Sequence, residues 1–253
     1  MLLAIDVGNT HSVFGLWTGF EWKPVYRFST PNLGTEDEIF ARLKSLEDAD
    51  FQLSKITKLA IASVNPMVDG DLERLGTECL KVPVVHLRSK REGVMPVLYE
   101  PADAVGADRI ANALGALALF APPMIIVDFG TATTFDCIDA QGAYMGGAIL
   151  PGPDTLMDSL TSKTAKLPRV PLETPERAIG RSTKESLQSG LVIGYSGSIS
   201  HILTSILLEM PGARCLCTGG LAPAIQKLVP EIGEYFPNLT LDGMRIWIEK
   251  VNQ

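Results

Sequence analysis

Two segments of the chain match each other, and this internal duplication limits the possible folds more than any other feature. Residues 2–14 and 124–136 each contain an apolar run that ends in Asp-x-Gly, followed by small hydroxyl or amide residues and then by β-formers. The two aspartates, Asp6 and Asp128, are 122 residues apart, close to half of the 253-residue chain. Self-similarity at this distance predicts a duplicated α/β domain of about 120 residues.

Each copy predicts a β-hairpin. The apolar run is typical of a buried strand, Gly8 or Gly130 allows a tight turn, and the β-rich segment that follows returns as the second strand. Further strands are expected at 58–64, 82–87, 142–150 and 213–218, and helices at 35–47, 69–79, 106–120, 153–162 and 182–210. This alternation predicts an α/β fold of two domains, residues 1–117 and 118–253, each with a mixed sheet flanked by helices.

The predicted helix at 182–210 contains three glycines, Gly190, Gly194 and Gly197. Glycine in a solvated helix costs about 1 kcal/mol relative to alanine. We therefore expect something to pack closely against the glycine-bearing face. The spacing alone leaves open whether that partner belongs to the same chain.

Composition and charge exclude several classes of protein. With 29 acidic against 22 basic side chains, a net charge of −7 and no run of Lys or Arg, nucleic-acid binding is disfavoured. The first basic residue is Lys23, so no signal peptide is expected. The longest apolar run, 113–127, contains two prolines and is shorter than the roughly 20 residues of a membrane helix, so no membrane span is expected. Four cysteines without zinc spacing favour a cytoplasmic protein with reduced core thiols.

The two Asp-x-Gly turns are candidate phosphate-binding sites. Glycine lets a phosphate approach the main chain, Thr and Asn donate hydrogen bonds, and an aspartate holds a hard cation directly or through water. A single turn of this kind is more often an ordinary hairpin with an Asx-turn. Because the turn occurs twice, we favour a pair of turns that bind the phosphates of one nucleotide from both sides.

Two more segments add to this pattern. Gly219 and Gly220 follow a predicted strand and offer a flat backbone platform for adenosine. Gly106–Arg109 opens a predicted helix, where Asp108 is either an ordinary helix cap or a base beside the guanidinium of Arg109. The residues alone leave both interpretations of Asp108 open.

Six motifs in one order resemble the acetate and sugar kinase, Hsp70 and actin superfamily and, within it, the type III pantothenate kinases. They are Asp6-Val-Gly-Asn-Thr10, Gly106-Ala-Asp-Arg109, Asp128-Phe-Gly-Thr-Ala-Thr-Thr134, Gly146-Gly-Ala-Ile-Leu-Pro-Gly152, Ile179-Gly-Arg-Ser-Thr183 and Thr218-Gly-Gly220. The resemblance implies duplicated actin-like (ribonuclease H-like) domains with a nucleotide cleft between them.

The resemblance also implies an activity, transfer of the ATP γ-phosphate to the 4′-hydroxyl of pantothenate, the first step toward coenzyme A. It implies a homodimer that needs a monovalent cation, K⁺ or NH₄⁺. Asp108 matches the proton acceptor and Asp128 the K⁺ ligand, and we expect Asp6 to hold Mg²⁺ through water. Arg109 would contact either the pantothenate carboxylate or the transferring phosphoryl group.

The implied contacts cover much of the chain. Pantothenate contacts are expected at Tyr99, Gly106, Ala107, Asp108, Arg109 and Thr183, and ATP contacts at Asp6, Val7, Gly8, Asn9, Thr10, His11, Ser12, Val13, Thr131, Gly219 and Gly220. Two alternatives remain on the same scaffold: a non-enzymatic transcription accessory protein and an exopolyphosphatase-like phosphohydrolase. The presence of Asp6 and Asp108 and the acidic composition favour the kinase.

Overall fold

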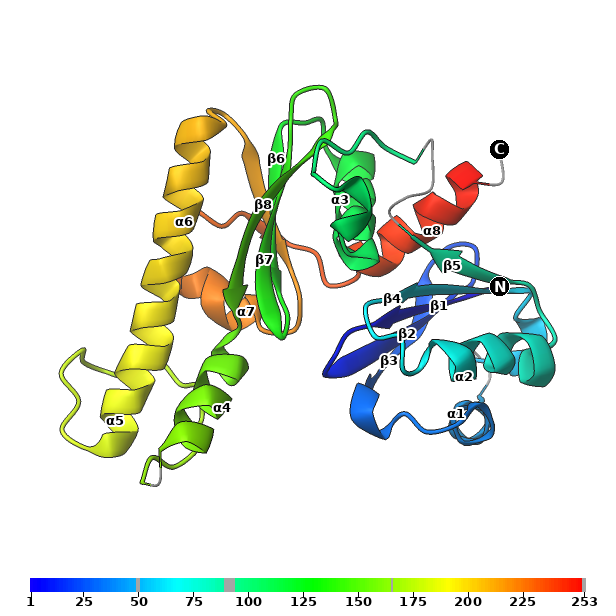
Figure 1. Cartoon of the computed structure of the whole chain (residues 1–253), viewed down its shortest axis with the longest axis horizontal. Coiled ribbons are helices and arrows are strands. Elements are labelled where there is room, and N and C mark those ends of the chain that lie inside the picture. The colour runs from blue at the N-terminus through cyan, green and yellow to red at the C-terminus, as the bar shows by residue number, and fades with distance from the viewer. Residues whose placement is uncertain (49–50, 89–93, 165, 252–253) are drawn as a thin grey trace. The chain divides into compact units, whose positions relative to one another are not determined.

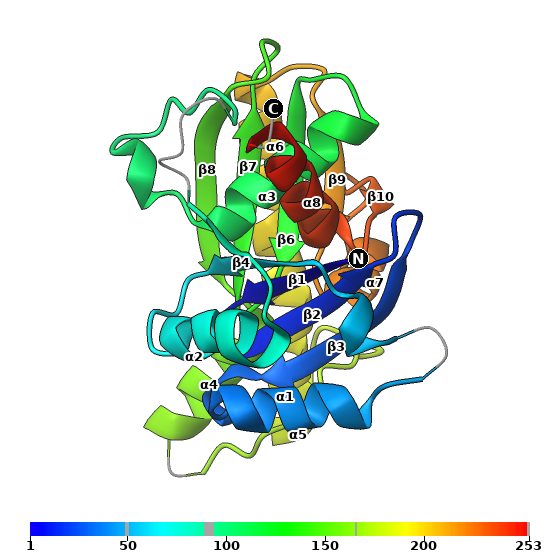
Figure 2. The ribbon, with the colours of Figure 1, turned by 90° about the vertical axis from the view of Figure 1, so that its right-hand side faces the viewer.

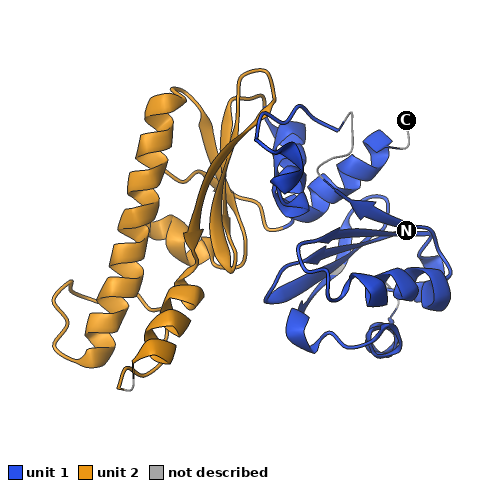
Figure 3. Ribbon diagram, viewed as in Figure 1, with its two compact units in different colours: residues 1–120, 238–253 blue, residues 121–237 orange. Residues whose placement is uncertain are grey.

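The computed structural model describes residues 1–48, 51–88, 94–164 and 166–251. It divides the chain into two compact units, residues 1–120 with 238–253 and residues 121–237 (Figure 3). Each unit contains a five-stranded mixed sheet with flanking helices, which confirms the predicted fold class.

The sheet of unit 1 has the strand order β3-β2-β1-β4-β5. Strand β1 pairs antiparallel with β2 and parallel with β4, so the hairpin and the crossover strands share one central strand. The strands are β1 (Leu2–Val7), β2 (His11–Trp17), β3 (Trp22–Ser29), β4 (Lys58–Ser63) and β5 (Val84–Leu87). The helices are α1 (Glu36–Ser45), α2 (Asp69–Arg74) with a π-helical continuation (Leu75–Leu80), α3 (Ala107–Leu119) and α8 (Leu239–Val251), with 3₁₀ turns at Thr30–Asn32, Leu53–Lys55 and Ala102–Ala104.

Alternation along β1 explains the core of unit 1. Leu3, Ile5 and Val7 are nearly inaccessible to solvent and belong to one apolar cluster, because every second side chain of a strand points to the same face. Helices α1 and α2 contribute Ile39, Leu43 and Leu72 to the same cluster, and both helices lie along the sheet in Figure 2. Helix α1 begins with a capping box, in which Thr35 and Glu38 bond each other's backbone.

Helix α8 belongs to unit 1, although the sequence division at residues 117 and 118 left its residues in the second half. It packs along α3, and the approach is so close that a Cβ at Gly243 would overlap the carbonyl of Ala111. Trp247 of α8 is fully buried. The sequence gives no local signal for this pairing, because the contacting residues are more than 120 positions apart in the chain.

Unit 2 repeats the topology of unit 1. Its order, β10-β9-β6-β7-β8, places the hairpin β6–β7 beside the parallel strand β9, just as β1–β2 lies beside β4. The strands are β6 (Met124–Phe129), β7 (Ala132–Ile138), β8 (Tyr144–Pro151), β9 (Arg214–Thr218) and β10 (Glu234–Tyr235). The helices are α4 (Pro153–Lys163), α5 (Thr183–Gln188), a π-helical segment (Ser189–Gly194), α6 (Tyr195–Glu209) and α7 (Ala222–Ile225), with a 3₁₀ turn at Gln226–Leu228.

The elements α5, the π-helical segment and α6 form one continuous helix, Thr183–Glu209 (Figure 1). Its buried side chains recur every four residues, whereas an α-helix turns every 3.6. The wider π-helical turn offsets this difference and keeps the stripe on one face. The stripe consists of Leu187, Leu191, Tyr195, Ile199 and Leu203.

The glycine-bearing face of the same helix has no close neighbour in the described chain. Apart from the neighbouring backbone of the helix itself, no heavy atom of the described residues lies within 4 Å of an ideal Cβ at Gly190, Gly194 or Gly197. This 27-residue helix contains an 18-residue stretch with a mean hydropathy of 1.6, of which 33% is buried, so by length and composition alone it is long and apolar enough to cross a membrane. The apolar run at 113–127 divides between α3 and β6.

Candidate functional site: two turns and the start of helix α3

The first turn connects β1 to β2. Val7 lies opposite Ser12, and the Gly8 N–H donates to the His11 carbonyl at 3.0 Å, so four residues form the connection. Asn9 and Thr10 lie exposed at its tip.

The second turn connects β6 to β7 and is one residue shorter. Phe129 lies opposite Thr133, and the Gly130 N–H donates to the Ala132 carbonyl at 3.2 Å. Thr131 lies exposed at its tip. Thr133 is fully buried and its hydroxyl is hydrogen-bonded to the Tyr195 hydroxyl of α6, so its side chain supports the turn from inside.

Two predicted glycine segments of unit 2 lie against the second Asp-x-Gly segment, one at Asp128 and one at the turn that follows it. Gly219 has φ of 90°, and a Cβ there would lie 2.6 Å from the Asp128 carboxylate oxygen Oδ1. A Cβ at Gly152 would lie 2.5 Å from the Gly130 carbonyl oxygen and 2.7 Å from that of Thr131. Only glycine fits both places, and both glycines therefore let backbone approach the turn and the carboxylate.

Asp108 lies in the first turn of α3, whose N-cap is Gly106. The Arg109 N–H donates to Asp108 Oδ1 at 2.8 Å and fixes the direction of the carboxylate. Burial raises the pKa of Asp108 above its ordinary value, and this N–H bond and the Arg109 charge oppose the rise. A Cβ at Gly106 would overlap Oδ1, so the absence of a side chain there leaves room for the carboxylate.

The other expected substrate contacts differ in exposure. Ala107 and Arg109 are buried, Tyr99 is half-buried in the loop before α3, and Thr183 is exposed at the start of α5. Tyr99 and Gly106–Arg109 belong to unit 1, whereas Thr183 belongs to unit 2.

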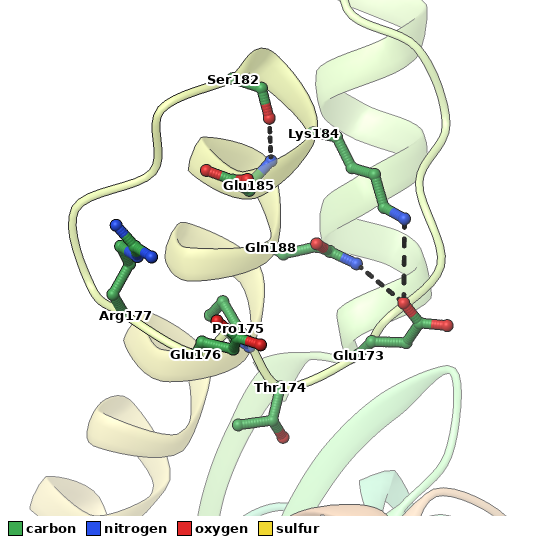
Figure 4. A pocket seen from close by; sticks show the side chains of 9 residues that line it. All are labelled: Glu173, Thr174, Pro175, Glu176, Arg177, Ser182, Lys184, Glu185 and Gln188. Atoms are coloured by element: carbon green, nitrogen blue, oxygen red, sulfur yellow. Dashed lines mark hydrogen bonds and ion pairs between the residues drawn. The ribbon is translucent and has the colours of Figure 1, made fainter.

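A cavity of about 340 Å³ adjoins the start of α5 (Figure 4). Ser182 caps the helix by accepting a hydrogen bond from the Glu185 N–H, and Lys184 and Gln188 both reach Glu173 across the cavity. Thr183 itself is not among the lining residues, although its two neighbours Ser182 and Lys184 are.

The expected ATP contacts differ in solvent exposure. Asp6, Gly8 and Val13 are partly exposed, as is Gly219, and His11 and Gly220 are exposed. Val7 and Ser12 are buried, so their side chains support the first turn from beneath. In the described part of the chain no group of three or more His, Cys, Asp or Glu side chains gathers as a metal cluster. Single carboxylates such as Asp6 and Asp128 fit cations that take their other ligands from phosphate and water.

Three supporting residues escape sequence reasoning. Thr30 bonds the first turn, and Thr155 and Tyr195 bond the second. The sequence does contain one signal for Thr30. The 122-residue offset that relates Asp6 to Asp128 also relates Thr30 to Gly152, so Thr30 is the duplicate of a motif residue.

The architecture is that of the actin-like α/β proteins. A Baf family transcriptional activator from Campylobacter jejuni superposes with a TM-score of 0.61 at 20% identity, covering 99% of this chain and 100% of that one. The ADPNP-bound activator of 2-hydroxyisocaproyl-CoA dehydratase from Clostridium difficile superposes with a TM-score of 0.54 at 12% identity, covering 99% and 96%. At these identities the similarity defines the fold and not the activity.

The family follows from the sequence itself. Residues 2–205 match the family described as type III pantothenate kinase. The type III pantothenate kinase of Thermomicrobium roseum is 41% identical over 255 aligned positions, which cover 100% of this chain and 98% of that protein. This chain belongs to the type III pantothenate kinase family.

Proposed function

We propose that Asp108 is the proton acceptor in the reaction that family membership gives this chain, the ATP-dependent phosphorylation of pantothenate in coenzyme A biosynthesis. The observation that carries this role is the orientation of the carboxylate, which Arg109 N–H holds at 2.8 Å and Gly106 leaves unobstructed. An oriented carboxylate is what a general base requires, since geometry comes before basicity.

Phosphoryl transfer requires little covalent chemistry from a protein beyond alignment and charge neutralisation. The backbone N–H groups and hydroxyls at the tips of the two turns, at Asn9, Thr10 and Thr131, are the proposed donors to phosphate oxygens. Asp108 then receives the hydroxyl proton of pantothenate. Because an alcohol is far more basic than a carboxylate, this transfer is coupled to formation of the new P–O bond.

Two carboxylates are proposed to hold cations, Asp6 for Mg²⁺ through water and Asp128 for K⁺ or NH₄⁺. Such cations supply positive charge that offsets the negative charge of the transferring phosphoryl group. Asp128 suits this role because the Gly219 backbone lies so close to its carboxylate that a Cβ on Gly219 would be 2.6 Å from Oδ1. Replacing K⁺ by Na⁺ at constant ionic strength is expected to lower kcat, and equal rates would remove the role of Asp128.

Arg109 is proposed as the residue that binds an anion of the substrate complex, either the pantothenate carboxylate or the transferring phosphoryl group. Its side chain is only 7% exposed, and a desolvated guanidinium binds an anion more strongly than an exposed one. Arg109→Lys separates the alternatives: a rise in KM for pantothenate with kcat intact indicates the carboxylate, and a fall in kcat indicates the phosphoryl group.

We also propose that the chain is a cytoplasmic homodimer that pairs through the glycine-bearing face of helix Thr183–Glu209. Gly190, Gly194 and Gly197 recur at positions i, i+4 and i+7, and apart from the neighbouring backbone of the helix itself no heavy atom of the described residues lies within 4 Å of their ideal Cβ positions. Ile193 and Leu208 on the same helix are 42% and 79% exposed. Gly194→Arg is expected to give a monomer by light scattering, and an unchanged dimer would exclude this face.

A coupled assay of ATP consumption with and without pantothenate tests the function. A regulator would consume no ATP, and an exopolyphosphatase-like enzyme would release phosphate without pantothenate. Asp108→Asn is expected to keep the fold and nucleotide binding and to lower kcat at least ~10²-fold, because positioned acid–base groups contribute this much. Near-normal turnover of this variant would exclude Asp108 as the base.

A further inference from the structure

We propose that Thr30 is a positioning residue for the first phosphate-binding turn. It is 2% exposed, lies in the 3₁₀ turn after β3 and contacts both ends of the connection between β1 and β2. This inference rests on the proposed use of that turn for nucleotide binding.

The backbone and side chain of Thr30 bind two different carbonyls of the turn. The Thr30 N–H donates to the Thr10 carbonyl at 2.9 Å, and the Thr30 hydroxyl donates to the Gly8 carbonyl at 2.8 Å. The Gly8 carbonyl shares a peptide plane with the Asn9 N–H, and the Thr10 carbonyl shares one with the His11 N–H. The two bonds therefore fix the direction of the Asn9 and His11 N–H groups before any ligand arrives.

A second buried hydroxyl completes the arrangement. Ser12 is fully buried and its Oγ lies 2.8 Å from Thr30 Oγ1. A hydroxyl has a single proton, and that of Thr30 is donated to Gly8. Ser12 is therefore the donor of the Ser12–Thr30 bond, and the two hydroxyls form a chain that ends on the Gly8 carbonyl.

Thr30 is itself held firmly. Its carbonyl accepts a hydrogen bond from the Leu33 N–H at 3.1 Å, and Leu33 is 1% exposed in the apolar cluster of unit 1. Every backbone and side-chain polar group of Thr30 is thus bonded, and none of its bonds reaches outward. Its effect on a nucleotide would pass through the backbone of the turn, which defines a positioning and not a catalytic residue.

Removal of the hydroxyl has a calculable consequence. Thr30→Val keeps the shape and the N–H bond but removes the hydroxyl that bonds the partly buried Gly8 carbonyl and the fully buried Ser12 hydroxyl. Without these two hydrogen bonds the first turn is no longer held in one conformation. The affinity for a nonhydrolysable ATP analogue with Mg²⁺ is therefore expected to fall about ten-fold. The KM for ATP should rise in parallel, while the KM for pantothenate stays within about two-fold.

Three further variants separate positioning from general damage. Thr30→Ser keeps the hydroxyl and should retain near wild-type affinity. Ser12→Ala leaves the Thr30–Gly8 bond in place and should lower affinity less than Thr30→Val does. Thr18→Val is the matched control, since Thr18 Oγ1 makes the same type of bond, 3.0 Å to the Glu21 carbonyl, in the turn at the other end of β2.

Calorimetric titration with the ATP analogue reads out this proposal without turnover, so it stands or fails apart from the proposed reaction. Weaker binding in Thr30→Val with recovery in Thr30→Ser supports it. Wild-type affinity in a folded Thr30→Val variant overturns it, as does equal loss in Thr18→Val or in both substitutions of Thr30. Should Thr30→Val fail to fold, Thr30→Ala, which also lacks the hydroxyl, decides, and wild-type affinity there overturns the proposal.

Discussion

The two turns are copies of one design, yet each is supported in a different way. In unit 1, Thr30 bonds the Thr10 carbonyl through its N–H and the Gly8 carbonyl through its hydroxyl. In unit 2 the equivalent position is Gly152, whose N–H donates to the Thr131 carbonyl at 3.0 Å. Gly152 has no hydroxyl to offer, and Thr155 of α4 donates to the same Thr131 carbonyl at 2.7 Å.

The difference follows from turn length. The second turn is one residue shorter, so its carbonyls lie against the chain that leaves β8, and a Cβ at Gly152 would meet two of them. The longer first turn leaves space there for a threonine side chain. A duplicated backbone therefore preserves the position of a support, while the local spacing decides whether a side chain or bare backbone provides it.

Substitution of a close-packed glycine should have different kinetic effects in the two units, and the largest effect is expected at Gly106, which lies against the Asp108 carboxylate of unit 1. In Gly106→Ala the new methyl group would overlap Asp108 Oδ1, and the carboxylate would rotate away because it is the movable partner. Misplacement of a reacting group by about 1 Å costs roughly 10²-fold in rate, so kcat should fall toward that level with ATP affinity intact. Steady-state kinetics with both substrates measures this, and an unchanged kcat would contradict the orientation given to Asp108.

Gly152→Ala should affect the other parameter. Its methyl group would meet the Gly130 and Thr131 carbonyls, which cannot move without distorting the turn. Overpacking of this kind costs about 1–3 kcal/mol, so we expect lower thermal stability and about ten-fold weaker ATP binding. Gly70→Ala is the control, since its nearest neighbour is the Arg74 guanidinium at 3.6 Å. Equal melting temperatures and ATP affinities for Gly152→Ala and Gly70→Ala would contradict the close packing of Gly152 against the turn.

Thr155→Val tests whether unit 2 depends on a hydroxyl as unit 1 does. The Thr131 carbonyl keeps its bond from Gly152 N–H after this substitution, and Thr155 is exposed, so water can replace the lost donor. We expect a rise of about three-fold or less in the Kd of an ATP analogue. A loss as large as that predicted for Thr30→Val would show that both turns depend equally on a hydroxyl.

The smallest expected effect is on the thermal stability of the protein and concerns Asp108 at the start of α3. Burial raises its pKa in the folded protein, so ionisation costs folding free energy as pH rises through that pKa. Asp108→Asn should therefore melt at the same temperature as wild type or slightly higher at neutral pH, and the gap should close as pH falls. Wild-type activity should decline in acid at a pH above the ordinary aspartate value of about 3.9. Melting curves and rates across pH test both statements.

The sequence by itself determined the duplication, the hairpins and the positions of Asp6, Asp108 and Asp128, because strand alternation, Asp-x-Gly turns and helix starts are local patterns. It also determined the family, since six motifs occur in one order. Each hairpin, turn and motif involves residues within a few positions of each other, where spacing along the chain reports spacing in three dimensions.

Only the tertiary structure decided what supports the turns and where the last helix belongs. Thr30 reaches a turn some 20 residues earlier, Tyr195 reaches Thr133 across 62 residues, and α8 packs on α3 through Gly243 and Ala111. Such contacts depend on how strands and helices stack and leave no periodic trace in the chain. Burial, which raises the pKa of Asp108, is likewise a property of the packed unit and not of the residue.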